Sequence, residues 1–259
     1  DKDNDLKLGG LQEIVTLIKR ASSSQLISFA GNLVVAFPLA ISIAWGYGEL
    51  MGTELLSIDK AEKLLKSIWP WIGGAVPFAA IAGVFLALSG LISGYVDNKV
   101  LASNLAHRLE GHPLLKRILP AQPRAKVANY LCKYLGALTG NVSLGFFLGM
   151  AGYLGYLTGL PIDIRHIAFS SANLGFAWQH LQFGATTLLL GGLSVLLIGA
   201  VNFAVSFGIT LYLTLKSRSI SFRDTFRLLG QLGRAVVTKP WAFLLPARGE
   251  EKISTENLA

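Results

Sequence analysis

The chain has 259 residues, of which 52% are apolar and 15% are charged, and its formal net charge is +8. A soluble domain carries about 25% charged residues, so this composition argues against an ordinary soluble enzyme. A single cysteine, Cys132, excludes an internal disulfide framework. With only four scattered histidines in addition, the sequence predicts neither a metal site nor a cofactor.

The charges lie in blocks separated by apolar runs of more than 20 residues. Such runs are long enough to cross a hydrocarbon layer of about 30 Å as helices. In chain order we predict four transmembrane helices, at about 25–47, 69–96, 134–160 and 186–215. Pro38 falls inside the first span, where a proline removes one backbone bond and usually kinks the helix.

The segments between the spans differ in their basic content. We predict an amphipathic helix in 1–24, a basic loop at 97–133, an outer loop at 161–184 and a basic amphipathic tail at 216–259. Lys and Arg number seven in 97–133 and eight in 216–259, against three in 49–68 and one in 161–184. Since basic loops stay in the cytoplasm, we expect both termini to be cytoplasmic.

The sequence repeats itself at an offset of 109 residues. Gly31-Asn32 aligns with Gly140-Asn141, Gly46-Tyr47 with Gly155-Tyr156, and Gly83 with Gly192 in one register. An internal repeat of this length indicates a duplicated structural unit. We therefore divide the membrane region into repeat 1 (25–96) and repeat 2 (134–215), each a pair of spans. Both repeats are predicted to begin on the cytoplasmic side, which makes them parallel.

The predicted fold is all-α: a polytopic membrane protein of four transmembrane helices in two parallel two-helix repeats, with amphipathic surface helices. Glycine pairs with Gly-x-x-x-Gly spacing favour close helix packing, among them Gly90/Gly94, Gly136/Gly140 and Gly145/Gly149. We expect such glycine faces to pack the two repeats together. We also expect the protein to form a homo-oligomer.

Two asparagines, Asn32 and Asn141, occupy matching positions in the repeats. They are candidate binding residues facing a pathway or ligand at the repeat interface. The alternative is that each amide joins neighbouring helices by bonding to their backbone, as polar residues in membrane helices do.

A polar cluster spans 163–173. If this segment is helical, Asp163, His166 and Ser170 share one face, and these residue types can form a hydrolytic relay. They are weak catalytic candidates, because relay residues usually come from separate parts of a fold. A ligand or partner site at Arg165, His166 and Asn173 is a second reading. A structural cap over the third and fourth spans is the favoured one.

The basic segments 97–133 and 216–259 could bind phosphate. Anionic lipid headgroups account for them, and they lack the regular aromatic residues of a single-strand binder. We therefore expect membrane lipids as partners and regard nucleic acid as an unlikely one.

The stretches Gly-Asn-Val-Ser-Leu-Gly-Phe-Phe-Leu-Gly-Met (140–150) and Gly-Leu-Pro-Ile-Asp-Ile-Arg-His-Ile-Ala-Phe-Ser-Ser-Ala-Asn-Leu-Gly (159–175) carry a resemblance. They resemble the membrane-embedded C-terminal part of a proteobacterial family described as site-specific recombinases of the Gcr type. The resemblance covers most of the chain and implies a protein of the bacterial inner membrane. It implies a longer protein with an N-terminal helical soluble region, which would be a further partner for this part.

Three functions follow as hypotheses. The preferred one is a non-enzymatic transport, channel or scaffold component, motivated by the duplication and the matched asparagines. The second is a membrane-anchored site-specific recombinase, as the resemblance implies. The third is an enzyme acting on a lipid or envelope substrate through His166. DNA strand exchange needs a Ser or Tyr nucleophile with several Arg residues around the phosphate. The Ser- and His-containing cluster is instead predicted on the outer side.

Overall fold

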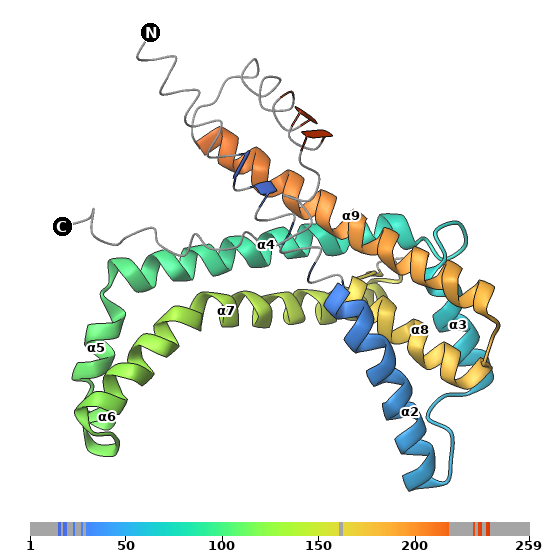
Figure 1. The fold of residues 1–259 in the computed structure, drawn as a ribbon, viewed down its shortest axis with the longest axis horizontal. Coiled ribbons are helices and arrows are strands. Elements are labelled where there is room, and N and C mark those ends of the chain that lie inside the picture. Colours follow the sequence, from blue (N-terminus) through green and yellow to red (C-terminus); the bar gives the residue numbers. More distant parts are fainter. Residues whose placement is uncertain are drawn as a thin grey trace. The chain divides into compact units, whose positions relative to one another are not determined.

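The computed structural model describes residues 30–160 and 163–217, with isolated positions outside these ranges. All secondary structure in these ranges is helical (Figure 1). The elements are η1 (Asn32–Ala36), α2 (Phe37–Met51), α3 (Ile58–Ile68), α4 (Ala75–Ala102), α5 (Leu105–Gly111), α6 (Pro113–Ile118), α7 (Ala121–Thr158), α8 (Ile167–Leu181) and α9 (Ala185–Ser217). The chain divides into two compact units, residues 36–213 and the two chain ends. The predicted amphipathic helices of 1–24 and 216–259 lie largely outside the described residues.

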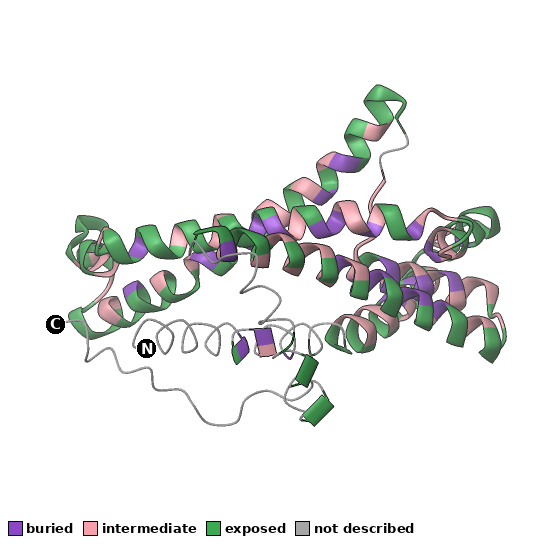
Figure 2. Ribbon diagram, turned by 90° about the horizontal axis from the view of Figure 1, so that it is seen from above, coloured by how far each residue is buried: buried purple, intermediate pink, exposed green. Residues whose placement is uncertain are grey.

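Four helical segments are long and apolar enough to cross a membrane, which confirms the predicted fold class. They are Asn32–Met51, α4, α7 and α9. Only 11–33% of the residues in their apolar windows are buried within the chain, and Figure 2 shows how much helix surface stays exposed. Apolar surface on this scale requires lipid or other protein around it.

The first span contains a local irregularity just before its proline. Residues Asn32–Ala36 form a single π-helical turn, and Pro38 follows in the first turn of α2. A π turn absorbs the backbone bond that a proline within a helix cannot make. Pro38 is therefore accommodated at a change of helix type.

The long helix α7 begins earlier than expected. The sequence predicted a basic loop up to residue 133, but α7 already begins at Ala121 and is continuous over its 38 residues. Pro123 lies in its first turn, where no intrahelical N–H bond is needed, so it does not interrupt the helix. A helix of this length measures about 57 Å at 1.5 Å per residue. It therefore extends well beyond a hydrocarbon core of about 30 Å.

The segment 161–184 is the main departure from the predicted organisation, because most of it is helix α8 and not an outer loop. The α8 residues buried against the protein recur at helical spacing, and they are Ile167, Ser170, Ser171, Leu174, Gly175 and Ala177. Small and polar members obscure this pattern in the sequence. Helix α8 packs against α2 and α3.

A candidate membrane span, a shorter helix and a second candidate span follow one another twice along the described chain, with α5 and α6 between the two sets. The short helices α3 and α8 begin at Ile58 and Ile167, 109 residues apart, and the long helices α4 and α9 begin at Ala75 and Ala185. Each repeat unit therefore contains a short helix between its two long ones.

Close backbone approaches hold the helices that surround the candidate site. Helix α4 lies along α7, where Gly136 faces the Asp97 carboxylate and Gly140 faces Ser93 and the Ser89 carbonyl. Helix α9 meets α4 at Gly83, where an added Cβ would lie 2.7 Å from Cβ of Val205. The other predicted glycine pairs, Gly90/Gly94 and Gly145/Gly149, have no neighbouring atom within 4 Å of an added Cβ among the described residues.

Candidate functional site

The site is organised around Asn202, a fully buried amide near the middle of α9. Its Oδ1 accepts a hydrogen bond from the Ile167 N–H at 3.1 Å. Its Nδ2 donates to the carbonyl oxygens of Ala79 at 2.8 Å and Arg165 at 2.9 Å. One side chain thereby joins α4, α9 and the start of α8. Because non-helical backbone is tolerated in an apolar interior only when its polar groups are paired, Asn202 permits the chain break before α8.

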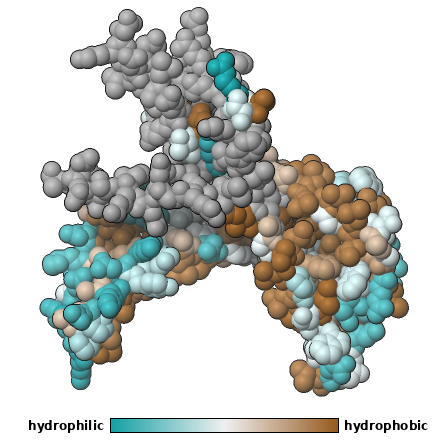
Figure 3. All heavy atoms as spheres, viewed as in Figure 1, coloured by the Kyte–Doolittle hydropathy of each residue, from teal (hydrophilic) through white to brown (hydrophobic). Residues whose placement is uncertain are grey.

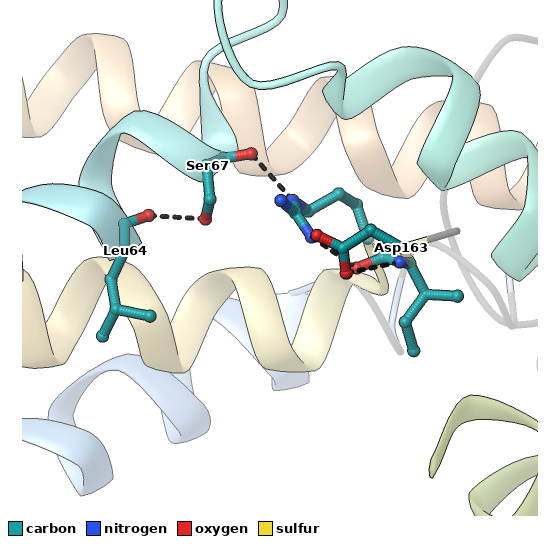
Figure 4. A network of polar contacts seen from close by, with 5 residues as sticks. Leu64, Ser67 and Asp163 are labelled. Atoms are coloured by element: carbon teal, nitrogen blue, oxygen red, sulfur yellow. Dashed lines mark hydrogen bonds and ion pairs between the residues drawn. The ribbon is translucent and has the colours of Figure 1, made fainter. Parts of the chain in front are cut away.

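Arg165 supplies the second half of the cluster through contacts with Ser67 and Asp163, which are labelled in Figure 4. Its Nε donates to the Ser67 carbonyl oxygen at 2.8 Å, at the end of α3. Its guanidinium carbon lies 5.5 Å from the centroid of the Phe78 ring, close enough for a cation–π interaction. Its backbone N–H donates to the Phe78 carbonyl at 3.3 Å. Arg165 therefore ties the segment before α8 to α3 and to the start of α4.

Asp163 partners this arginine. An oxygen of its carboxylate lies 2.6 Å from Nη1 of Arg165, and the other accepts the Ile164 N–H at 2.7 Å. The Asp163 side chain is half exposed, while that of Arg165 is only 12% exposed. The half-exposed carboxylate of Asp163 thus neutralises the nearly buried guanidinium of Arg165. Because the carboxylate is in contact with solvent, the ion pair contributes little to stability.

His166 is the N-cap residue of α8. Its Nδ1 accepts a hydrogen bond from the Ala168 N–H at 3.4 Å, and its ring meets Phe169 edge-on. An N-cap side chain satisfies one of the free N–H groups of the first helical turn. Burial lowers the pKa of the His166 imidazole below its usual value of 6.5, because desolvation disfavours the charged form. His166 is therefore neutral at pH 7, as acceptance of a hydrogen bond by Nδ1 requires.

This lowered pKa predicts an acid-sensitive contribution to stability. The unfolded chain binds the His166 proton more readily than the folded chain, so folding becomes less favourable as the pH falls below about 6.5. Above that pH the residue contributes no pH dependence. We expect His166→Asn, which keeps an N-cap acceptor, to match the wild type at pH 7.5 and to lose less stability at pH 5. Thermal unfolding in detergent at both pH values measures this; identical pH profiles would contradict it.

The proposed relay residues do not share a helical face, because α8 begins only at Ile167. Asp163 is paired with Arg165, and the His166 acceptor is occupied by the Ala168 N–H. Ser170 and the adjacent Ser171 are fully buried, and their hydroxyl oxygens have no hydrogen-bond partner within the described part of the chain. Asp163, His166 and Ser170 are close in sequence, but among the described residues their side chains bond to other groups or to none, and they form no proton path.

The other candidate residues lie apart from the cluster. Asn173 lies within α8 and is partly exposed, and Asn141 is exposed on α7. Asn32, in η1, is also partly exposed. Asn141 lies in the unit of residues 36–213 and Asn32 in the unit of the chain ends.

Sequence reasoning did not select Asn202, Ser67 or Phe78 for this site. Asn202 carries a usable signal, since an isolated amide in the middle of a charge-free helix must find partners. Ser67 and Phe78 contribute carbonyls and a ring, which leave no signature in the sequence. Within the described ranges, no group of three His, Cys, Asp or Glu side chains is placed to hold a metal ion.

Comparison with known proteins identifies the family. The sequence profile of a family described as "Site-specific recombinase" matches residues 2–246. No curated protein and no solved structure matches the chain. The match covers nearly the whole chain, including all helices that build the Arg165–Asn202 cluster. This chain therefore belongs to the site-specific recombinase family.

Proposed function

We propose that this chain is a membrane-embedded, non-enzymatic part of its family, acting as a scaffold or within a transport or channel assembly. The observation that supports this most is how the polar groups of the 163–167 segment are used. Arg165 is bonded to α3 and paired with Asp163, and Asn202 is bonded to three backbone groups. A catalytic group must keep an atom available for its substrate. These groups instead hold helices together, which favours the scaffold among the three roles.

The experiment compares the wild type with a double variant, His166→Asn with Ser170→Ala, in proteoliposomes. The variant removes the imidazole and the hydroxyl, while Asn keeps the cap and loss of an unpartnered buried hydroxyl costs little. We expect equal unfolding midpoints and no phospholipid hydrolysis that distinguishes the two proteins. Hydrolysis by the wild type that the equally stable variant lacks would replace this proposal with the lipid or envelope enzyme.

The proposal places the chain in the bacterial inner membrane with both termini in the cytoplasm. The Lys and Arg counts support this orientation, with seven in 97–133 and one in 161–184. In a Cys132→Ala background, a membrane-impermeant maleimide should label Gln122→Cys only from the cytoplasm and Thr53→Cys only from outside. Both positions are exposed. The reverse labelling would invert the topology.

A homo-oligomer is also part of the proposal. Within the part of the chain that the structure describes, the Gly145/Gly149 pair on α7 has open space around it, as a helix-contact face available to a partner would. Native mass spectrometry in lipid nanodiscs counts the subunits, and a monomer would remove this part. An N-terminal soluble region or other subunits would appear as co-purifying chains.

A second candidate is the membrane-anchored recombinase that the family description names. The family match and the seven Lys/Arg residues of 97–133 favour it. DNA binding through such residues weakens steeply as salt rises, because it releases counterions from the phosphates. Retention on duplex DNA at low salt that is lost at moderate salt supports this candidate. No retention at low salt would exclude it for this region.

A further inference from the structure

The end of the α4–α7 helix pair carries a charged surface that the Arg165–Asn202 cluster does not use. We call residues 99–133 the basic hairpin; it comprises the end of α4, the short helices α5 and α6, and the start of α7. It contains seven Lys/Arg residues and one acid, Glu110. Helix α5 packs on α7 and on α6, so these elements form one structure. Hydrophilic residues gather over it in Figure 3.

Two lysine–tyrosine pairs mark where the apolar helices end. Lys99 lies with its Nζ 5.7 Å from the centroid of the Tyr95 ring on α4, and Lys133 lies 5.5 Å from that of Tyr134 on α7. Both rings are well exposed, Tyr95 at 64% and Tyr134 at 45%. Exposed tyrosines with adjacent lysines are typical of the boundary between hydrocarbon and headgroups.

The two pairs lie at the same level of the helix pair. Gly136 of α7 faces Asp97 of α4, and one turn further along α7, Gly140 faces Ser93, one turn back along α4. The helices are therefore antiparallel, and Lys99 and Lys133 flank the same crossing point. Everything in the basic hairpin beyond this level lies on the headgroup side.

Exposed aliphatic side chains accompany the basic ones. Leu101, Leu114 and Ile118 are 78%, 62% and 73% exposed, and the cations Lys116 and Arg117 are exposed between them on α6. Protein surfaces that bind DNA are polar and strongly cationic. A surface that combines cations with exposed branched aliphatics suits the boundary of an anionic bilayer, where apolar groups enter the acyl region and cations meet phosphates.

From these observations we propose that the basic hairpin binds the headgroups of anionic phospholipids. Leu101, Leu114 and Ile118 enter the headgroup–acyl boundary, and the exposed lysines and arginines pair with lipid phosphates. Arg124 contributes less to the lipid, because its Nη1 donates to the Leu119 carbonyl at 3.5 Å and is part of the internal structure of the basic hairpin. The inference rests on the proposed function only in requiring a membrane-embedded protein.

The test measures lipid preference in the full chain. The protein is purified in detergent, incubated with equimolar phosphatidylcholine and phosphatidylglycerol, and the retained lipids are counted by native mass spectrometry. The variant is Lys116→Gln/Arg117→Gln/Lys126→Gln. The matched control, Lys60→Gln/Lys63→Gln/Lys66→Gln, removes the same charge from α3. All six side chains are exposed, so both proteins should keep the wild-type unfolding midpoint. If the hairpin triple variant unfolds at a lower temperature, the double variant Lys116→Gln/Arg117→Gln replaces it.

We expect the wild type and the control to retain phosphatidylglycerol preferentially. The preference of the hairpin variant for phosphatidylglycerol should be at least about tenfold weaker than that of the wild type. Each Lys or Arg near an anionic membrane raises the binding constant roughly fivefold. An unchanged preference in the hairpin variant, or an equal loss in the control, overturns the proposal. Duplex DNA binding that the hairpin variant abolishes while its lipid preference stays intact would assign the surface to nucleic acid. Extraction of the wild type from membranes by alkaline carbonate would instead contradict the proposed membrane function.

Discussion

Replacing Asn202 with leucine is expected to lower the free energy of unfolding by about 2–5 kcal/mol, the largest effect we predict for a single site. The amide satisfies the Ile167 N–H and the carbonyls of Ala79 and Arg165. Leucine has a similar volume but leaves the Ile167 N–H and the Arg165 carbonyl without this partner in a buried place. The Ala79 carbonyl lies inside α4 and keeps its helical partner. Hydrogen bonds between membrane helices average under 1 kcal/mol, so the effect comes mainly from unpaired backbone.

The matched control for this variant is Asn141→Leu. Both asparagines lie in long apolar helices, but Asn141 is exposed on α7 and Asn202 is buried. Thermal or SDS-induced unfolding of the purified protein measures both variants. We expect Asn141→Leu to change stability by less than about 0.5 kcal/mol, as surface substitutions usually do. Equal losses in the two variants would mean that Asn202 has no special role.

The substitution Gly83→Ala should have the second largest effect, a loss of about 1–3 kcal/mol from overpacking. The added Cβ would lie 2.7 Å from Cβ of Val205 and 3.0 Å from the carbonyl oxygen of Asn202. Neither atom is the end of a flexible side chain, so α4 and α9 would have to separate. That separation would also stretch the bond from Asn202 to Ala79.

The internal repeat provides the control, because Gly192 occupies the position that corresponds to Gly83. A Cβ added to Gly192 meets no atom of the described residues within 4 Å. Alanine also has a higher helix propensity than glycine, by about 0.5–1 kcal/mol, so Gly192→Ala should be neutral or stabilising. Unfolding midpoints of the two variants test the α4–α9 crossing. A Gly83→Ala protein as stable as Gly192→Ala would show that the helices do not approach closely there.

The membrane class could be predicted from the sequence because charge-free runs leave few alternatives. Each of the four predicted spans overlaps a helix of the structure that is long and apolar enough to cross a membrane. The ends were less predictable. A loop was predicted up to residue 133, but α7 begins at Ala121, and Pro123 does not break it because a proline in the first turn of a helix is harmless. The effect of a proline on a helix therefore depends on where in the helix the proline lies.

Helix α8 could not be recognised with the same ease, because its buried face contains Ser170, Ser171 and Gly175 alongside Ile167 and Leu174. A face with this composition does not give the pattern of apolar residues that identifies a buried helix in a sequence. Glycine is required at 175 since an added Cβ would overlap the carbonyl oxygen of Phe37 on α2. The helix is thus specified by close packing, which single-sequence periodicity does not record.

The Arg165–Asn202 cluster shows a different limit. Its partners are 35 to 123 residues apart, and most of them are backbone carbonyls that any residue provides. The polar residue types of the 163–173 segment were visible, and a structural cap was the favoured reading. The partners that give Arg165 and Asn202 their roles became identifiable only in three dimensions.

Hydrogen–deuterium exchange of the full chain in lipid nanodiscs tests the central claim most directly, namely that the 163–171 segment is part of the protein's internal packing. The Ile167 N–H donates to Asn202 and the Ser170 N–H to the His166 carbonyl at 2.9 Å. We predict that these amides exchange as slowly as those in the middle of α4, and that Asn202→Leu accelerates the Ile167 amide. Rapid exchange across 163–171 in the wild type, as in an open substrate-binding loop, would contradict the claim.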